Sequence, residues 1–246
     1  MATKIHKSFD RLLTIVGESS WLLFSFFFVG FIFALAINAI PGGEGFFEAS
    51  LGQLLAGGVI YALVLAVVVL PVLLRRGWRR LGDLLGVTKR PGWWILWLPV
   101  VMWVLYMSTT IIVGIIAKLV LPWLDVDQEQ QVGFQDISQP LEYVAAFIAL
   151  VILPPVAEEL LFRGYLFGRI RERAGFWLTT AVVSIVFGLV HLQWNVGIDV
   201  AVLSVFLCYL RERTGSVWSS IALHAVKNGV AYFFLFIGPL IGIQLL

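Results

Sequence analysis

The sequence predicts an all-α protein that crosses a membrane seven or eight times. Of its 246 residues, 60% are hydrophobic and 13% are charged, and the mean hydropathy is +0.95. Soluble domains average about 45–50% apolar and about 25% charged residues. Several apolar runs reach the length of about 20 residues that a helix needs to cross a bilayer. We therefore expect spanning helices rather than the core helices of a soluble fold.

The first apolar run, 21–40, follows three basic residues, Lys4, Lys7 and Arg11. A signal peptide begins in the same way, but its apolar region is shorter, and this chain stays hydrophobic after the run. We therefore expect a first spanning helix that is retained.

Six further apolar segments follow, and their lengths predict one spanning helix each. They are residues 51–74, 93–117, 143–168, 177–195, 197–210 and 216–237. The segment 197–210 is short for a hydrocarbon core of roughly 30 Å. After Gly238 and Pro239, the tail 240–246 forms either a further half-span or an interfacial segment. No internal repeat or linker divides the chain, so we expect a single membrane domain, 1–246.

Basic residues lie in alternating segments between the spans and predict the orientation. All but three of the 17 Lys and Arg residues lie before the first span or in the loops 75–90, 169–173 and 211–213. The positive-inside rule then places the N-terminus in the cytoplasm, with the plasma membrane as the location in a prokaryote. Loops on the opposite side contain acidic residues: Glu44, Glu48, Asp125, Asp127, Glu129 and Asp136.

Composition argues against several partners and cofactors. A net charge of +2, with no basic tract between aromatic residues, argues against nucleic-acid binding. The single cysteine, Cys208, excludes an internal disulfide and a cysteine-cluster zinc site. Of the three remaining basic residues, Lys118 can extend its charge to a helix end. Arg163 and Lys227 lie within apolar segments and need partners.

Charged residues in the fourth span are the strongest functional signal. Each charge at the centre of a bilayer costs roughly 2.5–3.5 kcal/mol, so such residues are functional candidates. Glu159 and Arg163 are spaced i,i+4 and can pair on one helix face. Glu158 points about 100° away and is left free for chemistry. Pro154 and Pro155 lie one turn earlier, where they predict a kink and freed backbone groups.

Two later spans add histidines. Phe187 and His191 lie four residues apart on one face, and so do His224 and Asn228. Alone, each histidine is an ordinary candidate for a hydrogen bond between helices. Counted from the cytoplasmic ends of their spans at 1.5 Å per residue, Glu158, His191 and His224 lie about 15, 21 and 12 Å deep. Packing contacts need not share one layer, whereas a common site would.

These residues resemble the three motifs of the CPBP intramembrane proteases, which include type II CAAX prenyl endopeptidases and bacterial Abi proteins. The motifs are Glu-Glu-x-x-x-Arg at 158–163, Phe-x-x-x-His at 187–191 and His-x-x-x-Asn at 224–228. The resemblance covers 140–240, which we expect to be the catalytic core. It implies eight helices and an architectural role for Glu159 with Arg163.

The resemblance also implies catalytic roles. Glu158 would activate water, with His191 binding or polarising it, while His224 and Asn228 would stabilise the oxyanion. Peptide hydrolysis needs such a base and such donors. Metal dependence stays open, since Glu158, His191 and His224 could instead ligate zinc with an open fourth position. We favour the metal-free alternative, because Asn228 is a neutral amide suited to oxyanion binding.

The expected function is hydrolysis of a peptide bond in a substrate held at or within the bilayer, prenylated or not. One rival interpretation is a non-catalytic binding or immunity scaffold. Another is a small proton-coupled transporter, in which Glu158, Lys227 and the histidines form a relay. Transporters often contain repeated halves, whereas here the polar residues gather in the C-terminal part.

Overall fold

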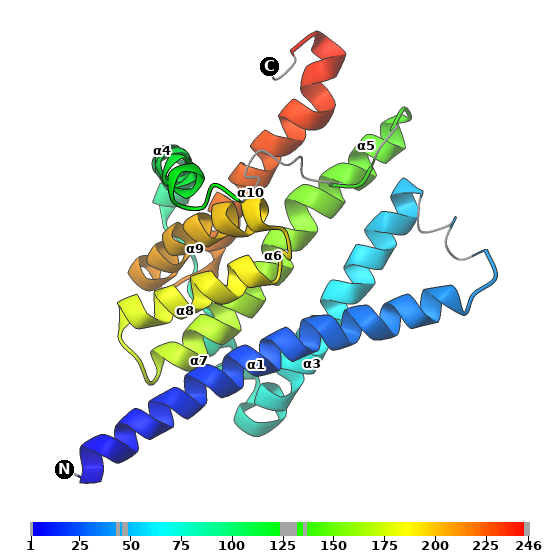
Figure 1. The fold of residues 1–246 in the computed structure, drawn as a ribbon. Helices are drawn as coiled ribbons and strands as arrows, with labels where there is room; N and C mark the ends of the chain where they lie inside the picture. Colours follow the sequence, from blue (N-terminus) through cyan, green and yellow to red (C-terminus); the bar gives the residue numbers. More distant parts are fainter. Residues whose placement is uncertain (1, 43–44, 46–48, 124–131, 135–136, 244–246) are drawn as a thin grey trace.

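The computed structural model describes residues 2–42, 45, 49–123, 132–134 and 137–243, with side chains from His6 onward. No strand occurs among these residues, and helices form most of the described chain (Figure 1). Six helices are long and apolar enough to cross a membrane, and a seventh apolar helix is shorter. The predicted all-α, multi-pass membrane fold is confirmed.

Each predicted span has a helix in the structure. In chain order they are α1 (Ala2–Asn38), α3 (Ser50–Leu85), α4 (Leu98–Val120) after the short η1 (Trp93–Leu96), a composite helix over 140–171, α8 (Phe176–Leu189), α9 (Trp194–Thr214) and α10 (Val217–Tyr232) with its continuations η4 (Phe233–Ile237) and η5 (Gly238–Ile241). No eighth spanning helix follows within the described residues, which end at residue 243; positions 244–246 of the tail lie outside them.

The helices extend past the predicted span ends, because hydropathy marks where a chain leaves the apolar layer and not where its helix ends. The polar residues 75–85 continue α3 after a bend at Gly77, whose φ of +76° suits glycine. Gly215, with φ of 66°, ends α9 in a left-handed C-cap. The expectation that 197–210 is the short span is wrong. α9 has 21 residues, and α8 is the short helix with 14.

The composite helix contains two π-helical segments between three α-helical ones. It consists of α5 (Pro140–Phe147), π-helical η2 (Ile148–Ile152), α6 (Leu153–Glu159), π-helical η3 (Leu160–Leu166) and α7 (Phe167–Arg171). Pro154 and Pro155 have no N–H to donate to the preceding turn, so the helix widens there instead of ending. Glu158 and Glu159 are the last two residues of α6, between the two wide segments.

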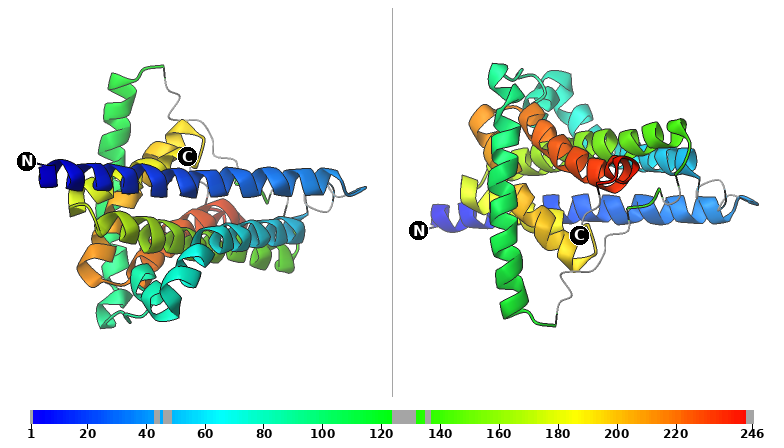
Figure 2. Two further views of the ribbon diagram at one scale, coloured as in Figure 1. Left: turned by 90° about the horizontal axis from the view of Figure 1, so that it is seen from below. Right: turned by 90° about the horizontal axis from the view of Figure 1, so that it is seen from above.

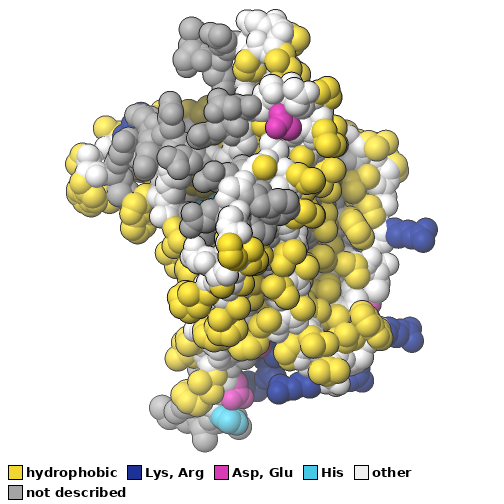
Figure 3. All heavy atoms as spheres, turned by 90° about the vertical axis from the view of Figure 1, so that its right-hand side faces the viewer, with side chains coloured by type: hydrophobic (Ala, Val, Ile, Leu, Met, Phe, Trp, Pro, Cys, Tyr) yellow, Lys and Arg dark blue, Asp and Glu magenta, His cyan; other side chains and the backbone are white. Residues whose placement is uncertain are grey.

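The other helices differ in how closely they approach one another and in their direction. α8 and α9 approach so closely that a Cβ added to Gly188 would lie 2.8 Å from the Gly197 carbonyl oxygen. α4 is seen end-on in Figure 1 and runs crosswise to α1 in both views of Figure 2; it packs against α9 and α10. Hydrophobic side chains cover much of the face in Figure 3, as a lipid-facing surface requires.

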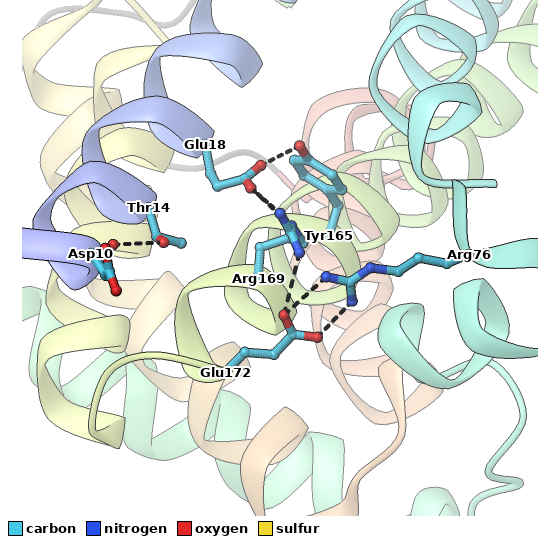
Figure 4. Close-up of polar contacts among 7 residues, drawn as sticks. All are labelled: Asp10, Thr14, Glu18, Arg76, Tyr165, Arg169 and Glu172. Atoms are coloured by element: carbon cyan, nitrogen blue, oxygen red, sulfur yellow. Dashed lines mark hydrogen bonds and ion pairs between the residues drawn. The ribbon is translucent and has the colours of Figure 1, made fainter. Parts of the chain in front are cut away.

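The basic segments meet at one end of the bundle, as their alternation predicts. Ion pairs there join α1, α3, α7 and α9, and Figure 4 shows those that link the first three. The pairs are Arg169–Glu18 at 2.6 Å, Arg76–Glu172 at 2.7 Å and Arg171–Glu212 at 2.9 Å. The acidic residues expected on the opposite side lie outside the described residues: Glu44, Glu48, Asp125, Asp127, Glu129 and Asp136.

Candidate functional site

The i,i+4 ion pair is present and fully buried. Arg163 Nη1 lies 2.9 Å from Glu159 Oε1, and both side chains are 0% exposed. The guanidinium also lies over the ring of Phe187, 4.3 Å from its centroid. A buried pair is held only when further contacts offset the loss of hydration, and the aromatic ring provides one such contact.

Glu159 also holds His224. The Nδ1 atom of His224 lies 2.9 Å from Glu159 Oε1, the same oxygen that Arg163 contacts. An ionised carboxylate only accepts hydrogen bonds, so Nδ1 carries a proton and Nε2 is the free nitrogen. This link between α6 and α10 spans 65 residues of sequence. No spacing rule predicts such a contact, and the sequence had assigned Glu159 to Arg163 alone.

Glu158 lies between α10 and α3. Its Oε2 atom is 4.0 Å from His224 Nε2, and its Oε1 accepts a hydrogen bond of 2.5 Å from the Tyr61 hydroxyl. The carboxyl group is buried. A distance of 4.0 Å is too long for a direct hydrogen bond. A separation of this size between two polar atoms suits a bridging water.

His191 lies in the turn after α8 and is oriented by that helix. Its Nδ1 is 2.8 Å from the Phe187 carbonyl oxygen, so Nδ1 donates and Nε2 is free. The Phe187 ring is 5.0 Å from the His191 ring and 6.1 Å from the His224 ring, both in edge contacts. Phe187 thus contacts both histidines and Arg163. The next residue, Leu192, has a φ of +56°, an unusual value for leucine.

Asn228 satisfies a carbonyl that the prolines leave without a donor. Its Nδ2 donates to the Leu150 carbonyl oxygen at 2.8 Å. That oxygen would be bonded by residue 154 in an α-helix or by residue 155 in a π-helix, and both are proline. One N–H of the amide remains for another acceptor. The structure therefore gives Asn228 a backbone contact that its motif did not predict.

Two polar contacts come from residues that the sequence did not single out. Tyr61 reaches Glu158 from α3, in the part of the chain that has no motif. Lys227 finds its partner in Asp199 of α9, with Nζ 3.8 Å from Oδ2. An acid within an apolar segment was the available signal for Asp199. The transporter interpretation grouped Lys227 with Glu158, but the ion pair of Lys227 lies elsewhere.

The predicted zinc ligands do not form a metal centre. Over the described parts of the chain, no group of three or more His, Cys, Asp or Glu side chains is placed to hold a metal ion. The described residues include Glu158, His191 and His224, the three that would ligate zinc if the site held one. The donor set therefore does not fit the three-ligand site that a catalytic zinc requires.

An apolar cavity lies near the end of α8, and its wall includes sequence neighbours of His191 but not His191 itself. It has a volume of about 330 Å³ and lies between α8 and α9. Leu189 and Leu192 line it on either side of His191 in sequence, and Gly188, Gly197 and others form the rest of the wall. A cavity of this size can hold one or two apolar side chains or part of a lipid-like chain.

Comparison with known proteins points to one family. Residues 140–230 match the family described as type II CAAX prenyl endopeptidase Rce1-like. The chain is also similar to "Putative membrane peptidase YdiL" of Bacillus subtilis (strain 168), with 26% identity over 102 residues. That match covers 42% of this chain and 41% of the relative. No solved structure matches the chain.

Proposed function

We propose that the chain, whose residues 140–230 match the Rce1-like family, is an intramembrane endopeptidase. Its substrate is a peptide segment held at or within the bilayer, prenylated or not. Residues 140–240 form the catalytic core of a single membrane domain, 1–246. The N-terminus faces the cytoplasm. In a prokaryote, the membrane is the plasma membrane.

The proposal rests on one observation: the adjacent residues Glu158 and Glu159 have different kinds of partner. Glu159 is occupied by Arg163 and His224. Glu158 is buried, and among the ion pairs of the described residues none joins it to a lysine or arginine. A carboxylate without a cationic partner is free to accept a proton. Its Oε2 lies 4.0 Å from His224 Nε2, a separation that a water placed beside both atoms can bridge.

The proposed reaction starts with a water held at Glu158. Glu158 Oε2 takes one proton from it, while the free Nε2 of His191 accepts its other hydrogen and orients it. The water oxygen attacks the peptide carbonyl carbon, and the carbonyl oxygen becomes an oxyanion. His224, donating from Nε2 when its ring carries both protons, and the remaining N–H of Asn228 stabilise this oxyanion. The oxyanion then re-forms a carbonyl as the C–N bond breaks, and Glu158 passes its proton to the leaving nitrogen. The products are a carboxylic acid and an amine, and Glu158 is ionised again.

Binding of substrate follows from the surroundings of the site. The apolar cavity between α8 and α9 is suited to a hydrophobic side chain of the substrate. An apolar site among helices excludes bulk water, so the donors act in a low dielectric. No step of this scheme uses a metal ion, since the side chains present do not fit one.

The test replaces Glu158 and follows new peptide ends. Membranes of the source cell are incubated with purified wild type or Glu158→Gln, and new N-termini are labelled and identified by mass spectrometry. Glu158→Gln keeps the size of the side chain and removes the base, so turnover should fall about 10²–10⁴-fold. Glu212→Gln is the matched control, since it alters an exposed ion pair and should keep full activity.

Two results would contradict the proposal. Wild type that yields no termini beyond those of Glu158→Gln would exclude peptidase activity on this membrane proteome. Glu158→Gln with wild-type turnover would show that Glu158 is not the base. Melting temperature and gel filtration of each variant establish that the comparison is between folded proteins.

A further inference from the structure

We propose that Tyr61 of α3 is a positioning residue for Glu158, so that the site includes a helix outside the matched segment 140–230. This inference rests on the proposed function, because it takes Glu158 as the base. Tyr61 lies in a span that hydropathy alone predicted, 97 residues before Glu158.

Close packing of two helices places Tyr61 at the site. α3 contacts α6 and both π-helical segments of the composite helix. One turn before Tyr61, a Cβ added to Gly58 would lie 3.8 Å from the Leu153 side chain, ordinary van der Waals contact. A Cβ at Gly58 would therefore meet Leu153 without strain, and the contact shows that α3 and α6 pack against each other at this level. The Tyr61 hydroxyl then reaches Glu158 Oε1 at 2.5 Å.

The two oxygens of Glu158 have different surroundings, and Tyr61 maintains that difference. Oε1 accepts from Tyr61, while Oε2 faces His224 Nε2 at 4.0 Å. Without the hydroxyl, rotation of the carboxylate about its last bond could exchange or misdirect the two oxygens. With it, Oε2 stays directed at the place of the water. Holding a reacting group in its productive orientation is a recognised source of rate enhancement.

The contact also survives proton transfer. When Oε2 takes a proton from water, Oε1 becomes the carbonyl oxygen of a neutral acid, which still accepts a hydrogen bond. Tyr61 therefore donates before and after the step and neither gains nor loses a proton. A donor that needs no rearrangement during the reaction is preorganised.

Two other tyrosine hydroxyls also donate to carboxylates, at places where the contact holds helices together. Tyr106 donates to Asp199 and Tyr165 donates to Glu18, each across two helices. In both cases the carboxylate also pairs with a cation: Lys227 for Asp199 and Arg169 for Glu18. Glu158 has a tyrosine donor without such a cation among the described residues. Tyr61 thus holds the carboxylate without neutralising it.

The experiment compares Tyr61→Phe with Tyr106→Phe, which removes the same kind of bond from Asp199. A hydrogen bond to a charged group is worth a factor of roughly 10–100. Tyr61→Phe should therefore lower kcat by about that factor and leave KM nearly unchanged, since the hydroxyl contacts Glu158 and not substrate. Tyr106→Phe should keep kcat within about twofold of wild type while losing a comparable amount of thermal stability.

The outcomes separate this inference from the proposed function. If Glu158→Gln is inactive but Tyr61→Phe is as fast as wild type, the role of Tyr61 is refuted and the proposed function stands. Equal losses of kcat in both Phe variants would make the contact structural, and a change in KM alone would make Tyr61 a substrate contact. An active Glu158→Gln would refute the proposed function itself. Should Tyr61→Phe fail to fold, 4-fluorophenylalanine at position 61 fills the space of the hydroxyl but cannot donate a hydrogen bond, and an unchanged kcat would then overturn the inference.

Discussion

Two polar clusters among the spanning helices contain the same kinds of group but differ in charge and in exposure. Each joins a carboxylate, a tyrosine hydroxyl and a residue of α10, and both lie among the spanning helices. The Glu158 cluster consists of Tyr61, Glu158, Glu159, Arg163 and His224. The Asp199 cluster consists of Tyr106, Thr110, Asp199 and Lys227.

The Asp199 cluster is balanced. Asp199 accepts from Tyr106 and, at 2.9 Å, from Thr110, and its other oxygen faces Lys227. One negative and one positive group cancel, which is what a structural pair requires. The Glu158 cluster has two carboxylates and one guanidinium, so one carboxylate is in excess while the His224 ring is neutral. Such an excess is expensive in an apolar layer, which indicates that packing alone does not account for Glu158.

The largest expected effect concerns stability at Arg163. Arg163→Ala leaves the fully buried Glu159 without its cation, which should cost about 3–5 kcal/mol of unfolding free energy. Lys227→Ala is the comparison in the Asp199 cluster, where the paired side chains are 20% and 32% exposed. Water can solvate Asp199 there, so the loss should stay near 1 kcal/mol. Unfolding in mixed micelles measures both, and equal losses would show that the clusters do not differ.

Sequence reasoning succeeded where one helix or the hydropathy carried the information. Sequence patterns predicted the apolar helices, six of which are long enough to span a membrane while the seventh is shorter. Charge and i,i+4 spacing also predicted the shared end of the basic segments and the pairing of Glu159 with Arg163. It could not give contacts between distant helices, because no local pattern specifies which faces meet. Tyr61 is one tyrosine in an apolar run, and Asp199 one acid in another. Their partners emerge only when the helices pack.

The second effect concerns Asn228, the motif residue that follows Lys227 on α10. Asn228→Ala leaves the Leu150 carbonyl without its donor, which should cost about 1–3 kcal/mol of stability. Pro154→Ala restores a backbone N–H that can reach the same oxygen. The loss on Asn228→Ala should therefore be smaller in the Pro154→Ala background.

A double-mutant cycle on unfolding free energies measures this coupling. A coupling indistinguishable from zero would mean that the Leu150 contact does not stabilise the fold. The same four proteins show what the remaining N–H contributes. If it stabilises the oxyanion, activity should stay low in the double variant even where stability has recovered.

The smallest effect lies outside the membrane, in the ion pairs at the basic end of the bundle. The hydrogen bond from Arg76 lowers the pKa of Glu172 below its ordinary value of 4.5, and the charges of Arg76, Arg169 and Arg173 act in the same direction. A carboxyl whose pKa is lowered by folding stabilises the protein above its unfolded-state pKa. That stability disappears as the pH falls through the folded-state pKa. Because Glu172 is 41% exposed, water weakens the effect, and we expect less than about 1 kcal/mol.

Melting temperature measured from pH 6 down to about pH 3 should therefore fall more steeply for wild type than for Glu172→Gln, which cannot titrate. Above pH 5 the two curves should run parallel, with the variant slightly lower. Curves that stay parallel throughout would mean that the pair is solvated in the folded state. Both Arg163–Glu159 and Arg76–Glu172 are Arg–Glu ion pairs, but their expected effects on stability differ. The first pair is fully buried, whereas water solvates the second.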